Sequence, residues 1–166
     1  DLYEAMKLCV GCKGCKRECP TGVDMAKMKV EFLHHYNKRH GLRLFERLVA
    51  YLPRYAPLAS RLAPVLNLRD RIPGLAGLSE VFLGFSRKRR LPAWRRDSFG
   101  ADEASPKTSG REVVLLADTF NTYFEPENAR AALRVLEAAG YRVHLPSAAD
   151  GGRPLCCGRT FLAAGL

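Results

Sequence analysis

Four of the six cysteines of this chain lie in one short stretch, LCVGCKGCKRECP, at residues 8–20. Cys9, Cys12, Cys15 and Cys19 are separated by two, two and three residues, and Pro20 follows the last of them. This is the spacing of cysteines that ligate a [4Fe–4S] cluster. The sequence therefore predicts that these four thiolates bind an iron–sulfur cluster.

The residues between the cysteines suit the same purpose. Gly11 and Gly14 carry no Cβ, so the loop can approach a cluster closely. Pro20 has no backbone N–H to donate and turns the chain away from the metal. Three cationic side chains are expected to offset the negative charge of a thiolate-ligated cluster: Lys13, Lys16 and Arg17.

Two other kinds of site compete with this interpretation, a zinc site and a pair of redox-active thiols. Zinc sites usually consist of two cysteine pairs separated by a longer stretch, which favours iron–sulfur here. In two-cluster ferredoxins the fourth cysteine of such a run ligates the other cluster. Cys19 would then serve a second cluster, and a cysteine upstream of Asp1 would complete the first.

A second cysteine motif, LCCGRTF, places Cys156 and Cys157 next to each other before Gly158. Both thiols can face one metal if the glycine allows the turn, but two thiols need further ligands from elsewhere. The alternative is a buried pair of small apolar residues. His34 and His35 have no nearby cysteine and are more typical of a surface or a packing contact.

Composition limits the class of protein. The chain has 166 residues and a formal net charge of +10, which fits one or two small globular domains. Clustered thiols in such a chain indicate a reducing, cytoplasmic compartment. Between Lys38 and Arg96 there are 14 Lys or Arg residues and three acidic ones. No nucleic-acid-binding motif accompanies this charge, so we expect a solvated surface, an interface, or peripheral contact with the inner face of a membrane.

Three regions differ in pattern. Residues 1–41 contain the cysteine run and a helix between Asp24 as N-cap and Gly41 as stop. Residues 42–110 are punctuated by prolines and predict short helices, PLASRLAPVLNL being the clearest, then a linker at 97–110. Residues 111–166 contain two strands, REVVLLAD and YRVHLP, around the helix PENARAALRVLEAAG, and a further helix starts at Arg159. The predicted fold class is mixed, with an α-helical segment followed by a βαβ unit.

The motifs together resemble a known family. LCVGCKGCKRECPTGVDMAKMKVEFL is similar to the second ferredoxin-type motif of FAD-linked oxidase family proteins with a fused iron–sulfur region. DTFNTYFEPENARAALRVLEAAGYRVHLP followed by CCGRTF resembles the cysteine-rich CCG domain of the same proteins. The resemblance covers nearly the whole chain, and with Asp1 at the start and a truncated CCG motif we expect a fragment of a longer protein.

The resemblance implies a function. In such proteins an FAD domain, here upstream of Asp1, oxidises a D-2-hydroxy acid, and electrons pass through iron–sulfur clusters to a quinone or a carrier protein. It implies that Cys9, Cys12, Cys15 and Cys19 are cluster ligands, and that Cys156 and Cys157 belong to the CCG motif, which binds metal in some relatives. The chain departs from the complete motif at Thr119, where relatives carry a cysteine, and a downstream Cys-x-x-Cys pair would lie beyond Leu166.

We therefore expect an electron-transfer module that contains no complete substrate-converting site. Its expected partners are the upstream FAD domain with its second cluster motif, the external acceptor and another copy of the protein, with no nucleic acid. One alternative is a zinc-stabilised basic module that binds nucleic acid or an anionic partner. The other is a subunit related to heterodisulfide reductase.

Overall fold

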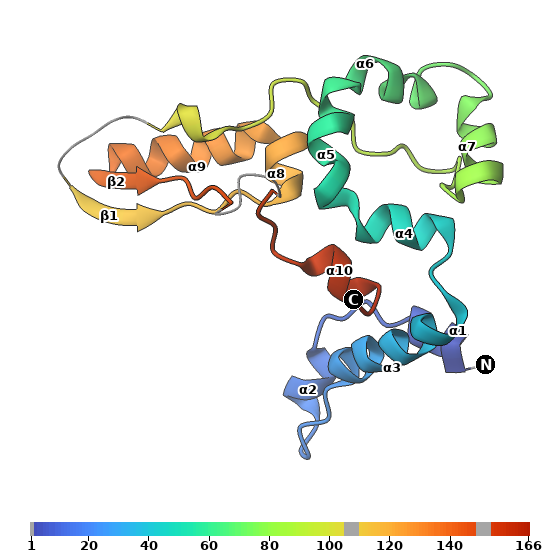
Figure 1. Ribbon diagram of the computed structural model, residues 1–166. Helices are drawn as coiled ribbons and strands as arrows, with labels where there is room; N and C mark the ends of the chain where they lie inside the picture. The colour runs from blue at the N-terminus through green and yellow to red at the C-terminus, as the bar shows by residue number, and fades with distance from the viewer. Residues whose placement is uncertain (1, 105–109, 149–153) are drawn as a thin grey trace. The chain divides into compact units, whose positions relative to one another are not determined.

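The computed structural model describes residues 2–104, 110–148 and 154–166. Most of these residues lie in helices, and two short strands form a parallel sheet (Figure 1). The chain forms two compact units, which are described separately. Unit 1 comprises residues 1–51 and 158–166, and unit 2 comprises residues 52–157.

Unit 1 is helical. Its elements are α1 (Leu2–Lys7), α2 (Gly14–Glu18), α3 (Met25–His40), α4 (Leu44–Ala50) and α10 (Arg159–Ala163). The predicted helix limits of α3 are confirmed. Asp24 accepts a hydrogen bond from the backbone N–H of Lys27 at 3.0 Å, and Gly41 ends the helix with φ of +76°.

The core of unit 1 gathers around α3. Tyr3, Ala26 and Leu33 are buried there, and Ala50 is buried at the end of α4, which contacts α10. The Tyr3 ring stacks on Tyr36 with centroids 4.2 Å apart. These small apolar side chains and the aromatic stack stabilise the packing of the N-terminal residues on the longest helix of the unit.

Unit 2 begins with a helical part consisting of α5 (Leu52–Arg61), α6 (Ala63–Leu66), the 3₁₀ helix η1 (Asn67–Asp70) and α7 (Leu75–Leu83). The prolines were expected to separate the helices, yet Pro57 lies inside α5. Trp94 anchors the irregular segment that follows α7. Its backbone N–H and C=O bond to the Asn67 side chain at 2.9 Å, and its ring lies 4.3 Å from that of Phe124.

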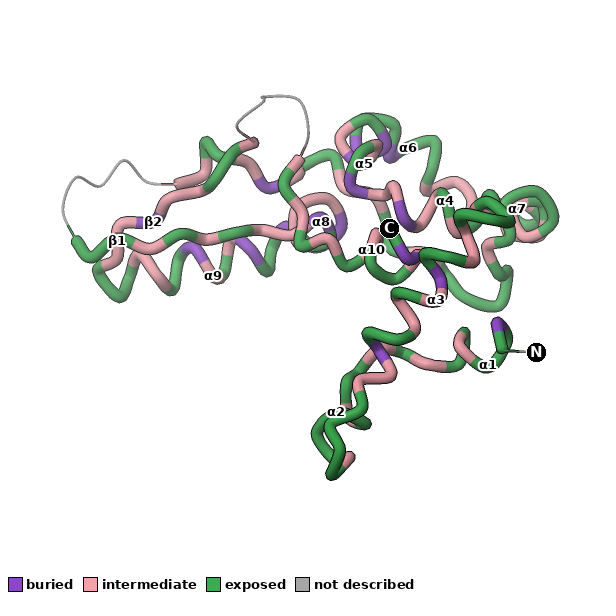
Figure 2. The backbone as a smooth tube through the Cα atoms, turned by 60° about the horizontal axis from the view of Figure 1, so that its bottom comes forward, coloured by how far each residue is buried: buried purple, intermediate pink, exposed green. Residues whose placement is uncertain are grey.

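The second part of unit 2 is the predicted βαβ arrangement. Strands β1 (Arg111–Val114) and β2 (Tyr141–His144) pair in parallel, with Arg111 opposite Tyr141 and Val114 opposite His144. Between them run α8 (Thr119–Tyr123) and α9 (Pro126–Ala138). One face of the sheet packs against α9 through Leu133 and Val143. Figure 2 shows buried positions on α9 and β2.

The predicted linker at 97–110 is wrong for its first part. Phe99 is buried in the core of the βαβ arrangement, and residues 101–103 form the 3₁₀ helix η2 (Ala101–Glu103). Arg130 of α9 binds this segment through Glu103 at 2.7 Å and Asp97 at 3.2 Å. This part of the segment, although poor in apolar residues, is thus held in place by one aromatic side chain and by ion pairs. The rest of the predicted linker, residues 105–109, lies outside the described residues.

Within the described residues, none of the helices combines the length and the apolar character that a membrane crossing requires.

Candidate metal centre

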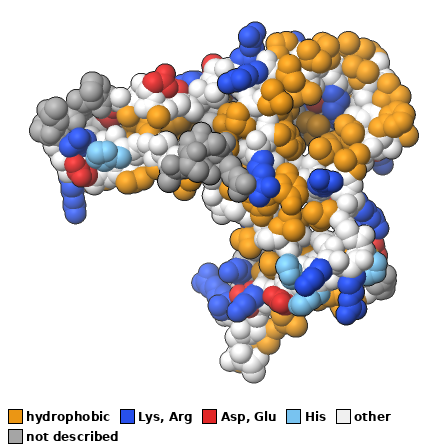
Figure 3. All heavy atoms as spheres, viewed as in Figure 1, with side chains coloured by type: hydrophobic (Ala, Val, Ile, Leu, Met, Phe, Trp, Pro, Cys, Tyr) orange, Lys and Arg blue, Asp and Glu red, His pale blue; other side chains and the backbone are white. Residues whose placement is uncertain are grey.

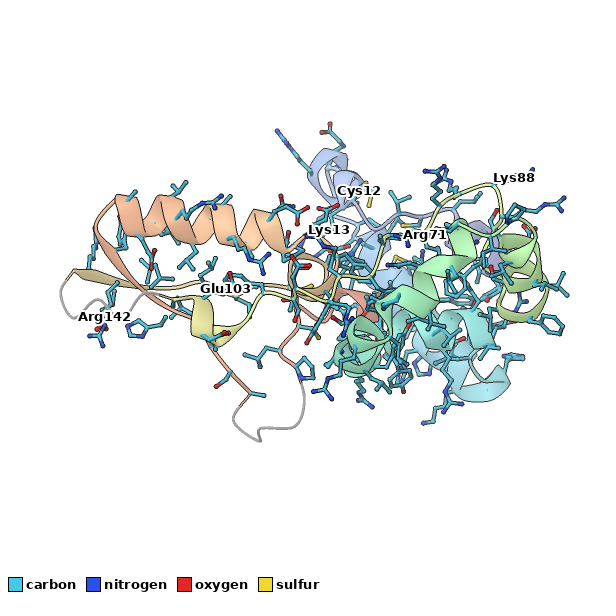
Figure 4. All side chains as sticks on the ribbon, turned by 90° about the horizontal axis from the view of Figure 1, so that it is seen from above. Cys12, Lys13, Arg71, Lys88, Glu103 and Arg142 are labelled. Atoms are coloured by element: carbon cyan, nitrogen blue, oxygen red, sulfur yellow. The ribbon has the colours of Figure 1, made fainter. Side chains whose placement is uncertain are left out.

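The four clustered cysteines lie at the start of unit 1, where short elements place them. Cys9 follows α1, Cys12 lies in the connecting loop, Cys15 is in α2, and Cys19 caps the end of α2. Cys12 and Cys15 are exposed, and Cys9 and Cys19 are half-buried. All four thiols are free, and Figure 4 marks Cys12 beside Lys13 before α2.

Left-handed backbone conformations shape this loop. Gly11 has φ of +68°, as a close turn at that position requires, and Lys13 has φ of +61°. Lys13 is the only described residue other than glycine with a positive φ. A non-glycine residue rarely adopts this conformation, so its presence within the cysteine run indicates a constrained loop.

Two cations hold the cysteine loop from other parts of unit 1. The Lys29 ammonium of α3 donates to the carbonyl oxygen of Cys9 at 2.5 Å. The Arg159 guanidinium of α10 donates to the carbonyl oxygen of Val10 at 3.1 Å. A Cβ at Gly11 would lie 3.2 Å from Nη2 of Arg159, so the guanidinium covers this turn. Sequence reasoning missed Arg159 in this role, because its only local signal is its place at a predicted helix start.

Cys19 lies where hydrogen-bond donors gather. Its sulfur is 3.1 Å from the Thr21 hydroxyl oxygen. This hydroxyl, followed by the backbone N–H groups of Val23, Thr21 and Gly22, lowers the pKa of the Cys19 thiol. Donors that converge on one sulfur stabilise its thiolate, which is the form that binds a metal.

The cationic residues of the run are only partly available to offset a cluster's charge. The Nζ atoms of Lys13 and Lys16 lie 4.0 and 3.7 Å from the Asp24 carboxylate. Arg17 is exposed and forms no ion pair with another described residue. Asp24 thus both caps the N-terminus of α3 and forms ion pairs with Lys13 and Lys16 of the cysteine run.

A cluster site can be tested against this geometry. The ligand atoms are of the right type for an iron–sulfur cluster, since four thiols occur at the required spacing and hydrogen bonds to Cys19 favour its thiolate. In arrangement they do not yet form a centre, because the described residues contain no group of three or more His, Cys, Asp or Glu side chains placed to hold a metal. Thiolate ligands commonly come together only when the metal binds.

Cys156 and Cys157 lie at the end of unit 2, half-buried and exposed respectively. The preceding residue, Leu155, lines a cavity of about 170 Å³ at the carboxyl ends of β1 and β2. Thr119, where the resembled motif would have cysteine, is buried at the start of α8. No third metal ligand accompanies the pair among the described residues.

The histidines make packing and surface contacts, as the sequence favours. His34 Nδ1 donates to the carbonyl oxygen of Gly165 at 2.9 Å, and His35 contacts Glu31 at 3.1 Å. His34 thus joins α3 to the residues after α10. Neither histidine lies in a group of potential metal ligands within the described ranges.

The chain is similar to several curated proteins. It is 27% identical over 164 residues to the D-2-hydroxyglutarate dehydrogenases of Pantoea ananatis and Escherichia coli, an alignment that covers 91% of this chain and 16% of each relative. The corresponding enzyme of Haemophilus influenzae is 29% identical over 167 residues, again with 91% of this chain and 16% of the relative.

No protein-family model matches the chain, and no solved structure gives a significant match. The chain therefore resembles one segment of the D-2-hydroxyglutarate dehydrogenases and spans about a sixth of their length.

Proposed function

We propose that this chain is the iron–sulfur electron-transfer segment of a flavin-dependent 2-hydroxy-acid dehydrogenase. The observation that carries the proposal is the spacing of Cys9, Cys12, Cys15 and Cys19. The similarity of nearly the whole chain to D-2-hydroxyglutarate dehydrogenases supports it. FAD would belong to another part of the whole protein.

In this proposal the four cysteines hold a [4Fe–4S] cluster, which when bound accepts and donates one electron at a time. Neighbouring residues of unit 1 hold the backbone of the cysteine loop in place. Lys29 and Arg159 fix the carbonyl groups of Cys9 and Val10, and the donors around Cys19 lower the pKa of its thiol and so favour the thiolate. Hydrogen bonds and nearby cations of this kind tune a cluster's potential.

The test is anaerobic reconstitution of the chain with iron and sulfide, followed by analysis of iron, sulfide and zinc and a visible spectrum. We expect about four irons per chain and a brown protein. Cys12→Ser and Cys15→Ser should each lose the cluster. A colourless protein that binds one zinc would instead support the zinc-stabilised basic module, and an iron content that neither variant reduces would refute the assigned ligands.

Metal binding by Cys156 and Cys157 is a separate proposal. The same analysis applied to Cys157→Ser distinguishes the two motifs. If the second motif holds no metal, this variant retains all the iron of the unsubstituted chain. A fall in iron content with an unchanged cluster spectrum would place additional iron at Cys156 and Cys157.

Electron transfer itself requires a further measurement on the reconstituted chain. Photoreduced flavin, supplied in solution under anaerobic conditions, should bleach the visible absorbance of the cluster. Added quinone should then restore the absorbance. A cluster that exchanges electrons with neither would be structural, and the relay would be refuted although the ligands were correct.

A further inference from the structure

Helix α7 of unit 2 exposes its apolar side chains in an unusual way. Its sequence is LAGLSEVFL, and none of its nine residues is buried. Val81 is 77% exposed, Phe82 is 72% exposed and Leu78 is 54% exposed. A helix that is apolar around most of its circumference is normally covered by other protein or by lipid. Figure 2 shows α7 without a buried position.

The exposed apolar area extends beyond the helix. The chain from α5 to the start of α7 also leaves large apolar side chains exposed, namely Leu58, Leu62, Val65, Leu66 and Ile72. Hydrophobic side chains accordingly gather over α6 and α7 in Figure 3. We call α7 together with these residues the α7 surface. Contiguous exposed apolar areas of this kind mark sites that contact a protein or a membrane.

A buried arginine fixes the geometry of the α7 surface. The Arg69 side chain is only 10% exposed, and its Nε donates to the Ser79 hydroxyl at 2.6 Å. Its Nη2 donates to the carbonyl groups of Phe85 at 3.2 Å and Ser86 at 2.9 Å. Arg69 therefore ties η1 to α7 and to the segment that follows it, so the helix and this segment are held together.

The segment that Arg69 fixes is strongly basic. Arg87, Lys88, Arg89 and Arg90 follow one another and are all exposed. Arg87 lies 3.4 Å from Glu80, which neutralises the one acidic residue of α7. The other three cations form no ion pair with any described residue. Figure 4 shows Lys88 on the segment after α7.

We propose that the α7 surface and the segment 87–90 together dock on an anionic membrane surface. Helix α7 would lie in the plane of the interface with Val81 and Phe82 among the acyl chains, and the basic segment would contact lipid phosphates. Stable membrane attachment requires two such signals, an apolar insertion and a basic cluster. A nine-residue helix is too short to cross the bilayer, so it lies at the surface.

Charge complementarity favours lipid over a protein partner. The buried centre of a protein interface is depleted of charge, and a specific interface pairs its cations with carboxylates of fixed position. Here three adjacent unpaired cations border an apolar helix whose only acid is already neutralised. A dense layer of mobile phosphates satisfies such a cluster without a matched set of partners. Each cation near an anionic leaflet strengthens binding by about fivefold.

The experiment is cosedimentation of the chain with vesicles of phosphatidylserine and phosphatidylcholine, and with vesicles of phosphatidylcholine alone. We expect binding only to the anionic vesicles. The triple variant Lys88→Gln, Arg89→Gln, Arg90→Gln should bind on the order of a hundredfold more weakly. Phe82→Ser should also weaken binding, because it removes an inserted side chain without removing charge.

A matched variant controls for the net charge of +10. The substitutions Lys27→Gln, Lys38→Gln and Arg39→Gln remove the same charge from exposed positions of α3. We expect this variant to bind like the unsubstituted chain. An equal loss in both triple variants would show general electrostatic attraction and overturn the proposal. Failure to bind anionic vesicles would also overturn it and leave a protein interface as the use of this surface.

Two further measurements keep the result clear if a variant folds poorly. Circular dichroism should give the same helix content for every variant, because all substituted side chains are exposed. Tryptophan fluorescence of Phe82→Trp should be quenched by lipids brominated on their acyl chains more than that of Trp94 in the unsubstituted chain. Equal quenching of the two tryptophans would show that α7 does not insert. If the chain associates with itself and Phe82→Ser abolishes this association, the α7 surface would instead bind a second copy of the chain.

Discussion

The Arg159 guanidinium donates a hydrogen bond to the carbonyl oxygen of Val10 at 3.1 Å, across 149 residues of sequence. Within unit 1, an arginine of the LCCGRTF motif thus holds the loop of the first cysteine run. The contact lies between Cys9 and Cys12, where a shift of the backbone would displace both candidate ligands.

The first prediction concerns this contact. Arg159→Ala should free the loop, so that the reconstituted cluster loses iron to a chelator about 10- to 100-fold faster, as for other residues that support metal ligands. Amide hydrogen exchange in the metal-free chain should also become faster at residues 10–12. Arg39→Ala removes an exposed arginine from the same unit and should change neither quantity. Equal exchange rates in Arg159→Ala and the unsubstituted chain would refute the positioning role.

The second prediction concerns Gly165, which packs directly on α3. Its φ is +74°, and a Cβ there would lie 2.5 Å from the backbone nitrogen of His34. Gly41 has a similar φ of +76° but no atom within 4 Å of its would-be Cβ. Gly41 has ψ of 166°, so Gly41→Ala should cost only the strain of this glycine-specific backbone conformation, about 1–3 kcal/mol.

Gly165→Ala should cost more, because it adds overpacking of about 1–3 kcal/mol to the strain of a positive φ. The measurement is amide hydrogen exchange of α10 together with urea unfolding. The rate of amide hydrogen exchange in α10 should rise in Gly165→Ala and stay unchanged in Gly41→Ala. If both variants behave alike, the close packing of Gly165 on α3 contributes nothing.

The third prediction concerns acid stability of unit 2. Hydrogen bonds from Arg95 and Arg130 lower the pKa of Asp97 to about 2, and Arg130 lowers the pKa of Glu103. Because both carboxyl pKa values are depressed on folding, their stabilisation is present above the ordinary values of 3.8 and 4.5. It is lost as the pH falls from there towards 2.

Arg130→Gln should therefore lower the melting temperature at pH 7 by a few degrees and reduce the difference between pH 7 and pH 2. Exposed ion pairs contribute only about 0–1 kcal/mol each, so the effect is small. Arg134→Gln removes an exposed arginine from the same helix, and its melting curves should follow the unsubstituted chain. Parallel loss in both variants would attribute the effect to net charge.

The fourth prediction concerns Tyr3, whose hydroxyl donates to the Glu46 carboxylate at 2.7 Å. Burial, and then this hydrogen bond, raise the pKa of Tyr3 to about 12. The resulting stabilisation is present below the ordinary tyrosine pKa of 10.0 and is lost as the pH rises to about 12. Tyr3→Phe should remove the last step of a spectrophotometric tyrosine titration.

Glu46→Gln separates the two causes. The amide oxygen still accepts the hydrogen bond, while the negative charge is gone. We expect the Tyr3 pKa to fall only part of the way towards 10.0, because burial is the larger cause. A complete return to the ordinary value would show that Glu46 dominates instead.

Several elements follow from the sequence because their signals are local. The apolar spacing between Asp24 and Gly41 defines α3, since a cap, a helical face and a stop are all contained in one short segment. The same is true of α9 and the two strands on either side of it, which require the parallel pairing observed. The proposed cluster ligation by the four cysteines likewise rests on their local spacing.

Other features depended on contacts between distant residues. The 97–110 segment has the pattern of a linker because it is poor in apolar residues, yet its one aromatic side chain, Phe99, enters the core, and Arg130 binds Glu103. No local sequence pattern predicts a contact of this kind between distant residues. Likewise, the apolar sequence of α7 is the same whether the helix is buried or exposed, and only the fold leaves Phe82 uncovered.

The sequence by itself thus determined where α3, α9, β1 and β2 lie, and it predicts which cysteines would ligate a cluster. Only the tertiary structure decided that Arg159 reaches the cysteine loop, that Gly165 must lack a side chain, and that Arg69 presents α7 beside four cations. The physical reason is that thiol chemistry and helix signals belong to near neighbours in sequence. Packing and hydrogen bonding join whichever residues the folded backbone brings together.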